Sequence, residues 1–447
     1  MFCNKLIIAL IVLSTVSTLL SIELSVDEAV EIGIKNSLEL ETLRTKLKQS
    51  KVDIDLAKST VFPVISGQLS YTRLNEAPSF DLPAGAFGQT PTGLLPPVDV
   101  HIPMGDENNY KATLTATQPL FLGGRDWTAI KLSKIYTSIV DDQIISEELK
   151  IRLKIKEVFY QALLAEKMTA LMESSYDNAL QHLEQVQSLR TGGAITSYDL
   201  LRARVQVNNL KPQVQNIRSG ADLAKRALLV LLRLPADQPL KLKGDFPHNP
   251  KDNPVPSLEE CINTAKKDRA EIKQLDKQIK ILEGAVSIQK AGHYPSLFAV
   301  GNFNYSAYDF NFKKDTWTND WNVSLVMSIP IFSGFKVVAE TKKARYDLDQ
   351  AELGKKQLID GIELQVRSYH NALLVAAENL KGLFSTIQEA EMGVEIATSR
   401  YKTGASTQVE YFDSELALEK SKTLYLQGLY DYTIAWLRLN YAMGKKI

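Results

Sequence analysis

Cysteine is almost absent from this chain, and neither sign of charge dominates it. The 447 residues contain only two cysteines, Cys3 and Cys261. We expect Cys3 to leave with an N-terminal signal, so that Cys261 alone remains and neither an intramolecular disulfide nor a metal-thiolate site can form. Lys plus Arg and Asp plus Glu both number 52. This balance argues against a nucleic-acid partner, since such proteins carry an excess of basic residues.

A long hydrophobic run is also missing. The N-terminus has Lys5, an apolar run from Leu6 to about Val16, and then small residues. The run is shorter than the roughly 20 apolar residues that a membrane-spanning helix needs, and the pattern is typical of a secretory signal. We therefore expect residues 1–21 to be a signal peptide, with approximate cleavage between Ser17 and Ser25.

Catalytic and metal-binding constellations are not found in the sequence. The five histidines, at positions 101, 182, 248, 293 and 370, lie far apart and include no i, i+4 pair. Gly123-Gly124-Arg125 lacks the Lys-Ser/Thr end of a phosphate-binding loop. We therefore expect no enzyme, no cofactor and no metal site, and we interpret the histidines as structural or exposed.

Proline occurs in only four parts of the chain, which leaves long segments free to be helical. Arg125 to Thr191 contains neither Gly nor Pro, and its apolar residues recur at helical spacing. This pattern predicts one helix of about 65 residues, roughly 100 Å long at 1.5 Å per residue. Lys336 to Tyr401 is its counterpart, and we expect it to be more flexible because each glycine costs up to about 1 kcal/mol relative to Ala. Its glycines are Gly354, Gly361, Gly382 and Gly393.

A returning helix follows each long helix, at about 198–234 and about 409–443. The sequence thus predicts two long helical hairpins, over 125–234 and 336–443, with a kink at Pro212 in the first. Further helices, about 26–59 and 257–291, precede the hairpins. Capping boxes that begin at Ser25 and Ser257 mark their starts.

The two halves of the chain repeat each other. Gln118-Pro119-Leu120-Phe121-Leu122-Gly123 returns as Ile329-Pro330-Ile331-Phe332-Ser333-Gly334. Pro119 to Gly193 and Pro330 to Gly404 are each 74 residues apart. The pattern predicts a duplicated unit: a first structural repeat at 22–241, a linker at 242–256, and a second repeat at 257–447.

Four short segments alternate apolar and polar residues, at about 63–73, 110–119, 295–306 and 321–330. This period of two predicts strands with one apolar and one polar face, which suits a soluble antiparallel sheet as well as a membrane sheet. The polar face consists of Ser, Thr, Asn and Gln, and aromatic residues gather at both ends of the strands, which favours membrane strands around a water-filled lumen. The aromatic residues are Phe62, Phe121, Tyr294 and Phe332 at one end, and Tyr308, Phe310, Phe312, Trp317 and Trp321 at the other. Four strands cannot close a barrel, so such a protein must oligomerise.

In the order and spacing of these features, the chain resembles the TolC-like outer membrane efflux proteins, or outer membrane factors. The resemblance covers essentially the whole mature chain and includes two similar turns, Gly193-Ala-Ile-Thr-Ser-Tyr-Asp199-Leu-Leu and Gly404-Ala-Ser-Thr-Gln-Val-Glu410-Tyr-Phe. It implies a membrane β-barrel plus a long α-helical coiled-coil barrel. Each protomer would supply four strands and two long helical hairpins in an internal two-fold repeat, completed by trimerisation.

The resemblance also implies where the protein acts and with what. The location would be the outer membrane of a Gram-negative-type bacterium, in contact with outer membrane lipid and with a long periplasmic extension. The protein would be a homotrimeric channel, the exit duct of a tripartite efflux or type I secretion system. A periplasmic adaptor (membrane fusion protein) and, indirectly, an inner-membrane transporter would open it for passive export of drugs, metal ions or a polypeptide.

The resemblance assigns roles to residues at the two helical turns. The tip gate contacts would involve Asp199 and Tyr401, while an Arg of some relatives falls at Ser406, which puts that ionic latch in doubt. A pore constriction would fall at Glu410 and Asp413, which share a helix face at i, i+3. The adaptor-docking turns would be Gly193, Ala194, Ile195 and Thr196, and Gly404, Ala405, Ser406 and Thr407. Taken alone, the same residues fit helix ends that need positive φ and a solvated acidic face.

Two other classes of protein share some of these features. A periplasmic adaptor would have a single hairpin between β-rich halves, whereas here the hairpin occurs twice. A structural coiled-coil rod would not need strands with polar faces and aromatic ends. The sequence favours the channel over both.

Overall fold

The computed structural model describes residues 22–83, 100–191, 195–247, 254–311, 313 and 316–447. The predicted signal peptide, residues 1–21, lies outside this part of the chain. The described residues divide into two compact units. One lies within 1–47, 139–276 and 353–447 and is helical apart from one short strand pair, whereas the other, within 48–138 and 277–352, contains the main sheet.

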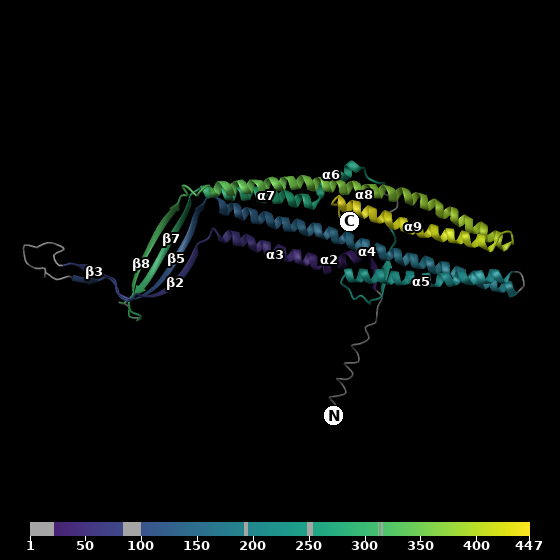
Figure 1. Cartoon of the computed structure of the whole chain (residues 1–447), viewed down its shortest axis with the longest axis horizontal. Helices are drawn as coiled ribbons and strands as arrows, with labels where there is room; N and C mark the ends of the chain where they lie inside the picture. The colour runs from purple at the N-terminus through teal and green to yellow at the C-terminus, as the bar shows by residue number, and fades with distance from the viewer. Residues whose placement is uncertain (1–21, 84–99, 192–194, 248–253, 312, 314–315) are drawn as a thin grey trace, which may run out of the picture. The chain divides into compact units, whose positions relative to one another are not determined.

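The main sheet has four antiparallel strands in the order β2-β5-β7-β8 (Figure 1). Their bounds are β2 Val64–Arg73, β5 Asn108–Leu122, β7 Ser296–Ala307 and β8 Thr318–Ser328. All four segments that alternate in sequence are therefore strands. β2 and β8 lie at the two edges of the sheet, where each pairs on one side only with another strand of the described chain.

The strand register places apolar residues on one face of the sheet and Thr and Asn on the other. Leu114 lies opposite Phe303, which lies opposite Trp321, and the neighbouring rank brings Gly301 opposite Val323. On the other face, Thr115 Oγ1 donates to Asn302 Oδ1 at 2.9 Å. Asn302 Nδ2 in turn donates to Asn322 Oδ1 at 3.2 Å. The expected alternation is confirmed, since successive side chains of a strand point to opposite faces.

Aromatic side chains meet at one end of these strands. Tyr71 stacks on Tyr110 with ring centroids 4.8 Å apart, and Tyr110 lies 5.2 Å from Phe310. Tyr305 stacks on Trp317 at 5.0 Å. Phe332 and Phe335 form an edge-to-face pair beyond β8, just before the next helix. Phe312 lies outside the described residues.

A short hairpin that the sequence did not predict lies between β2 and β5. β3 (Ser79–Leu82) pairs with β4 (Val100–Pro103), so that Phe80 lies opposite Ile102. Prolines and glycines are frequent in this segment and favour a loop. Two four-residue strands are too short for an alternating pattern to be recognised.

The two helical hairpins have helices of equal length. α4 (Arg125–Thr191) and α8 (Lys336–Lys402) each contain 67 residues, and α5 (Ser197–Leu231) and α9 (Gln408–Ala442) each contain 35. Within the helical unit, α5 lies alongside the later part of α4, and α9 alongside the later part of α8 (Figure 1). The helix runs through Pro212, which removes one backbone donor without ending α5.

The helices that precede the hairpins are interrupted, which corrects the prediction of single helices at 26–59 and 257–291. α2 (Val26–Asn36) stops at Ser37 before α3 (Leu38–Ser59), and α6 (Leu258–Asp268) stops at Arg269 before α7 (Ala270–Lys290). Both stopping residues have extended ψ angles, 121° and 123°.

Long-range hydrogen bonds hold both interruptions. Asn36 Nδ2 donates to the carbonyl of Leu232, just after α5, and Arg269 donates to the carbonyl of Ala442, at the end of α9. Each interruption thus provides a donor for a helix end that has no partner within its own helix. Local sequence could not show this, because the partners lie more than 170 residues away.

A short parallel strand pair lies in the helical unit. β1 (Ile22–Ser25) pairs with β6 (Leu240–Lys243), so that Leu24 lies opposite Leu242. β6 ends at Lys243, inside the linker predicted at 242–256. Residues 248–253 of that linker, which include His248, lie outside the described part.

Two clusters of buried apolar side chains stabilise the helical unit. One contains Phe159 of α4, Leu229 of α5 and Leu437 of α9, and the other contains Cys261 of α6, Val366 of α8 and Leu439 of α9. Each fully buried side chain of this size contributes about 1.5–3 kcal/mol. Cys261 is buried with a free thiol. Among the described residues, no helix combines the length and hydropathy needed to cross a membrane.

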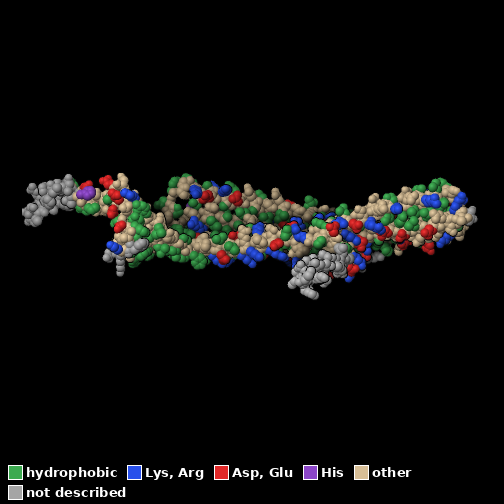
Figure 2. Space-filling view, turned by 90° about the horizontal axis from the view of Figure 1, so that it is seen from below, with side chains coloured by type: hydrophobic (Ala, Val, Ile, Leu, Met, Phe, Trp, Pro, Cys, Tyr) green, Lys and Arg blue, Asp and Glu red, His purple; other side chains and the backbone are tan. Residues whose placement is uncertain are grey.

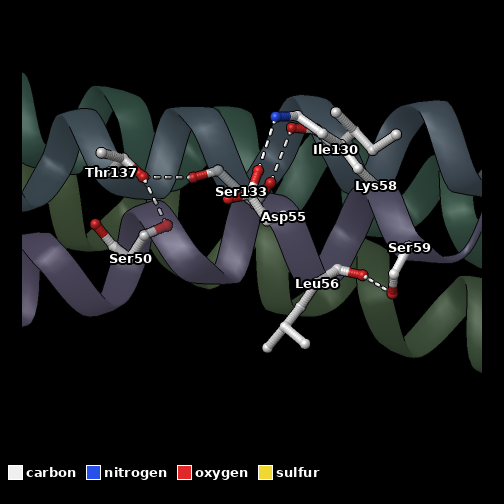
Figure 3. A network of polar contacts seen from close by, with 8 residues as sticks. All are labelled: Ser50, Asp55, Leu56, Lys58, Ser59, Ile130, Ser133 and Thr137. Carbon is white, nitrogen blue, oxygen red and sulfur yellow. Dashed lines mark hydrogen bonds and ion pairs between the residues drawn. The ribbon is translucent and has the colours of Figure 1, made fainter.

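Polar contacts join helices within the sheet-containing unit. Thr137 Oγ1 of α4 donates to the carbonyls of Ser50 in α3 and Ser133, both at 3.1 Å (Figure 3). Asp55 and Lys58 of α3 form an exposed ion pair at 2.8 Å in the same view. On the face drawn in Figure 2, Lys and Arg side chains are interspersed with Asp and Glu along the helices, in agreement with the balanced composition.

Candidate functional site at the helical turns

The first turn connects α4 to α5 through a complete capping box. Asp199 N donates to Thr196 Oγ1 at 3.3 Å, and Thr196 N donates to Asp199 Oδ2 at 3.1 Å. Two backbone donors at the start of α5 are thereby satisfied. Gly193 and Ala194 of this predicted docking turn lie outside the described residues.

The second turn connects α8 to α9 through a left-handed glycine. Gly404 has a φ of 74°, its N–H donates to the carbonyl of Tyr401, and Ala405 N donates to the carbonyl of Arg400 at 2.8 Å. This pair of bonds is the Schellman motif, which favours glycine because a side chain at positive φ is strained. Thr407 then caps α9 by accepting from Glu410 N at 3.3 Å.

An arginine from the preceding helix braces each turn. Arg190 donates to the carbonyl of Ile195 at 3.3 Å and to Ser197 Oγ at 2.8 Å. Arg400 donates to the carbonyl of Ala405 at 3.1 Å. In both turns the acceptor lies five residues after the arginine, so the turns share a brace as well as an N-cap.

The contacts of the predicted gate residues Asp199, Tyr401 and Ser406 can be described. The Asp199 carboxylate is engaged in the helix cap, and its charge, after burial, is the second cause that raises the pKa of Tyr401. The Oγ of Ser406 is buried without a hydrogen-bond partner among the described residues. An ionic latch at position 406 is not possible with a serine.

The two predicted constriction residues lie on the first turns of α9. Glu410 and Asp413 are both exposed in the single chain. Glu410 Oε2 lies 3.9 Å from Arg400 NH1, an exposed pair that contributes little to stability. The structure thus leaves both carboxylates available to a lumen or to solvent.

An aromatic cluster that sequence analysis did not predict joins the two hairpins near these turns. His182 of α4 is 5% exposed. Its ring stacks on Tyr411 at 4.9 Å and lies 5.6 Å from Tyr401 and 5.0 Å from Phe412. Gln408 Nε2 lies 3.2 Å from His182 Nε2. We call these five residues the His182 cluster.

A cavity of about 30 Å³, the size of one water, adjoins the cluster. Its lining includes Glu415 and Glu419 of α9 and Gln206 of α5. Burial raises the pKa of Glu419, Ser175 lowers it through a hydrogen bond, and the Glu415 charge raises it. Burial also raises the pKa of Tyr411 and lowers that of His182.

The His182 cluster and the arginine braces escaped sequence analysis for a physical reason. His182 meets Tyr401 and Tyr411, which lie more than 200 residues later, and no local pattern reports such a contact. The histidine had been interpreted as structural or exposed, and it is in fact buried at a junction. The braces do have a pattern in the local sequence, because each arginine lies five residues before the turn residue whose carbonyl it contacts. This pattern could have predicted them.

Comparison with known proteins identifies the family. The model of the family described as "Outer membrane efflux protein" matches residues 31–232 and 261–445. The chain belongs to this family. The channel interpretation of the sequence is confirmed, and the alternatives of an adaptor or a structural rod are set aside.

Two curated relatives and one solved structure show the extent of the similarity. The alkaline protease secretion protein AprF of Pseudomonas aeruginosa is 24% identical over 352 residues, which cover 76% of this chain and 70% of AprF. The outer membrane protein TolC of Escherichia coli is 20% identical over 349 residues, covering 76% of this chain and 70% of TolC. The crystal structure of the Campylobacter jejuni CmeC outer membrane channel gives a TM-score of 0.72 at 17% identity, covering 94% of this chain and 85% of CmeC.

Proposed function

We propose that three copies of this chain form the exit duct of a tripartite efflux or type I secretion system. Each copy contributes its four-stranded sheet to one barrel in the outer membrane and its two hairpins to a periplasmic tube. The duct supplies no energy. It lets cargo pass when an adaptor and an inner-membrane transporter open its periplasmic end.

The two faces and two open edges of the sheet carry this proposal. The apolar face is exposed in the single chain, with Leu69 at 84%, Trp321 at 74% and Val323 at 72%. That face suits lipid, whereas the Thr and Asn ladder on the other face suits a water-filled lumen. β2 and β8 each have an unpaired edge, and an unpaired backbone group in hydrocarbon costs several kcal/mol. Pairing β8 of each copy with β2 of the next closes twelve strands.

The helices support the same assembly. The equal lengths of α4 and α8, and of α5 and α9, fit an internal two-fold repeat, from which three chains build six similar hairpins. α8 also carries large apolar side chains that are exposed in the single chain. These exposed residues include Leu364, Val375, Phe384, Met392 and Ile396. Neighbouring copies would bury them, as helical bundles require.

The turns form the periplasmic end of the duct in this proposal. The turn at 404–407, and its counterpart at 193–196, would dock onto the adaptor, and Asp199 and Tyr401 would take part in closing the gate. Glu410 and Asp413 of three copies would place six carboxylates around the pore, where they attract cations.

Cell fractionation followed by gel electrophoresis tests the assembly. We expect the protein in the outer membrane fraction, and we expect unheated samples in SDS to migrate as trimers that heating converts to monomers. A protein that fractionates with the periplasm, or that migrates only as a monomer without heating, would contradict the proposal.

A further inference from the structure

His182 is a titratable group that the channel mechanism above does not use. It comes from α4 of the first hairpin, and the rings that surround it come from α8 and α9 of the second. All of these segments belong to the helical unit. The imidazole therefore lies at a contact between the two hairpins, close to the turns at which each hairpin ends.

In the orientation that the structure shows, Gln408 makes its hydrogen bond to a neutral His182 ring. The Gln408 amide nitrogen only donates, so at 3.2 Å it requires His182 Nε2 to accept, which a protonated ring cannot do. Gln408 Oε1 is buried without a partner in the described part of the chain. A half-turn of the amide would let the Nε2–H of the ring donate to this oxygen, so the preference for the neutral ring rests on the burial of His182 among three aromatic rings.

The charges that face the cluster are few. α4 presents His182 itself, α5 lines the adjoining cavity with the uncharged Gln206 and Leu210, and α8 presents Tyr401. α9 presents Tyr411 and two carboxyl groups. These are Glu415 and Glu419, which line the cavity beside the ring. Asp199 of α5 acts on Tyr401.

We propose that the His182 cluster is an acid-sensitive latch that holds the tip of the first hairpin against the second, and that protonation of His182 releases it. Burial disfavours the charged ring, and the pKa of His182 is lowered by this desolvation. Above about pH 6.5, the ordinary pKa of histidine, the ring is neutral in both the closed and the separated state. Its titration therefore does not weaken the closed state in this range. As pH falls below this value, the separated state binds the proton more readily, and the contact is lost.

The latch is a contact within one chain, and only its consequence for gating rests on the proposed function. In a trimeric duct, release of the first hairpin from the second would loosen the periplasmic end. Acid would then favour opening independently of the carboxylates at Glu410 and Asp413.

Distance measurement between two spin labels tests the latch directly. Labels at Leu189→Cys on α4 and Met392→Cys on α8 occupy exposed positions, 44% and 56%, on different hairpins. Cys261 is replaced by Ala in the full-length protein, and excess unlabelled protein isolates distances within one chain. Pulsed electron-electron double resonance gives the distribution of distances between the labels. We expect this distribution to shift to longer distances or to broaden when the pH is lowered from 7.5 to 5.5. An unchanged distribution would overturn the proposal.

Two variants attribute the response to His182. His182→Phe keeps an aromatic ring without the titration, and its distance distribution should be the same at both pH values. Gln408→Glu places a carboxylate beside the ring, which should stabilise the protonated form within the cluster and suppress the acid response. A full response in both variants would show that another group titrates.

A further variant examines the neighbouring carboxyl groups. The double variant Glu415→Gln and Glu419→Gln should keep the acid response, and loss of the response there would overturn the assignment to His182. Single-channel recording then examines gating, with an open probability that rises on acidification in wild type and stays level in His182→Phe. A latch that responds in the distance measurement while no channel forms would contradict the duct and leave the latch intact.

Discussion

Acidic residues at corresponding positions of the two turns behave differently. Asp199 closes a reciprocal capping box, whereas Glu410 donates its backbone N–H to Thr407 and leaves its carboxylate near Arg400. The acid of the second hairpin therefore lies outside the helix cap, in an exposed pair with Arg400, whereas that of the first is engaged in the cap. This difference supports the assignment of the pore constriction to the second hairpin.

The constriction assignment predicts a change in ion selectivity. Replacing both Glu410 and Asp413 by Ala removes two charges per chain without breaking the Thr407 cap, because that cap uses a backbone donor. We expect the reversal potential under a salt gradient to shift toward a less cation-selective value. Glu184→Ala, which removes an exposed carboxylate of α4 outside the predicted gate and constriction, is the control and should leave selectivity unchanged. An unaltered reversal potential in the double variant would refute the constriction.

The left-handed glycine predicts how the second turn tolerates substitution. Gly404→Val forces a branched side chain to a φ of 74°, at a cost of about 1–2 kcal/mol, whereas asparagine adopts this region readily. We expect Gly404→Val to abolish export with its adaptor while trimers still form, and Gly404→Asn to retain export. Export by both variants would argue against a docking role for this turn.

At the scale of elements, the sequence predicted what depends on neighbours in sequence. The bounds of α4 and α8, the N-cap at Ser25 and the faces of the strands all follow from local spacing. The breaks at Ser37 and Arg269 did not follow, because carbonyls far along the chain hold them. Among the site residues, Thr407 and Gly404 could be assigned to helix ends, but the burial of His182 could not.

The glycines of α8 provide a prediction about helix flexibility. A Cβ added at Gly361 or Gly393 meets nothing within 4 Å, so Ala should stabilise the helix by up to about 1 kcal/mol at each position. We expect a raised thermal midpoint and slower gating in the double variant. Gly33→Ala in α2 is the control, since its Cβ would collide with Ile155, and it should lower the midpoint. Equal changes of the thermal midpoint for the α8 and the α2 substitutions would contradict the idea that the space around the added Cβ decides the outcome.

The sheet predicts opposite outcomes for neighbouring substitutions in β8. Val323→Lys places a charge on the apolar face, at a cost of about 2–4 kcal/mol near the centre of a bilayer. Asn322→Lys places the same charge on the polar face. We expect Val323→Lys to reduce the yield of heat-modifiable trimers strongly and Asn322→Lys to preserve it. Equal loss in both variants would contradict the assignment of the apolar face to lipid and of the polar face to the lumen.

At the scale of the whole molecule, each half of the chain contains two strands of the main sheet and one long hairpin, which fits the proposed repeat. The second half differs by the glycines of α8 and by acids that lie outside the helix cap. Residues of both halves meet again at the His182 cluster. The first hairpin thus supplies the fixed partner of a contact, and the second supplies the part that we expect to move.

Single-channel recording of the purified protein in a planar bilayer tests the central claim most directly, because a duct must conduct. We expect discrete conductance steps from trimers, with cation selectivity that depends on Glu410 and Asp413. Purified outer membrane trimers that insert into the bilayer without conducting, in the presence of their adaptor as well as in its absence, would contradict this claim.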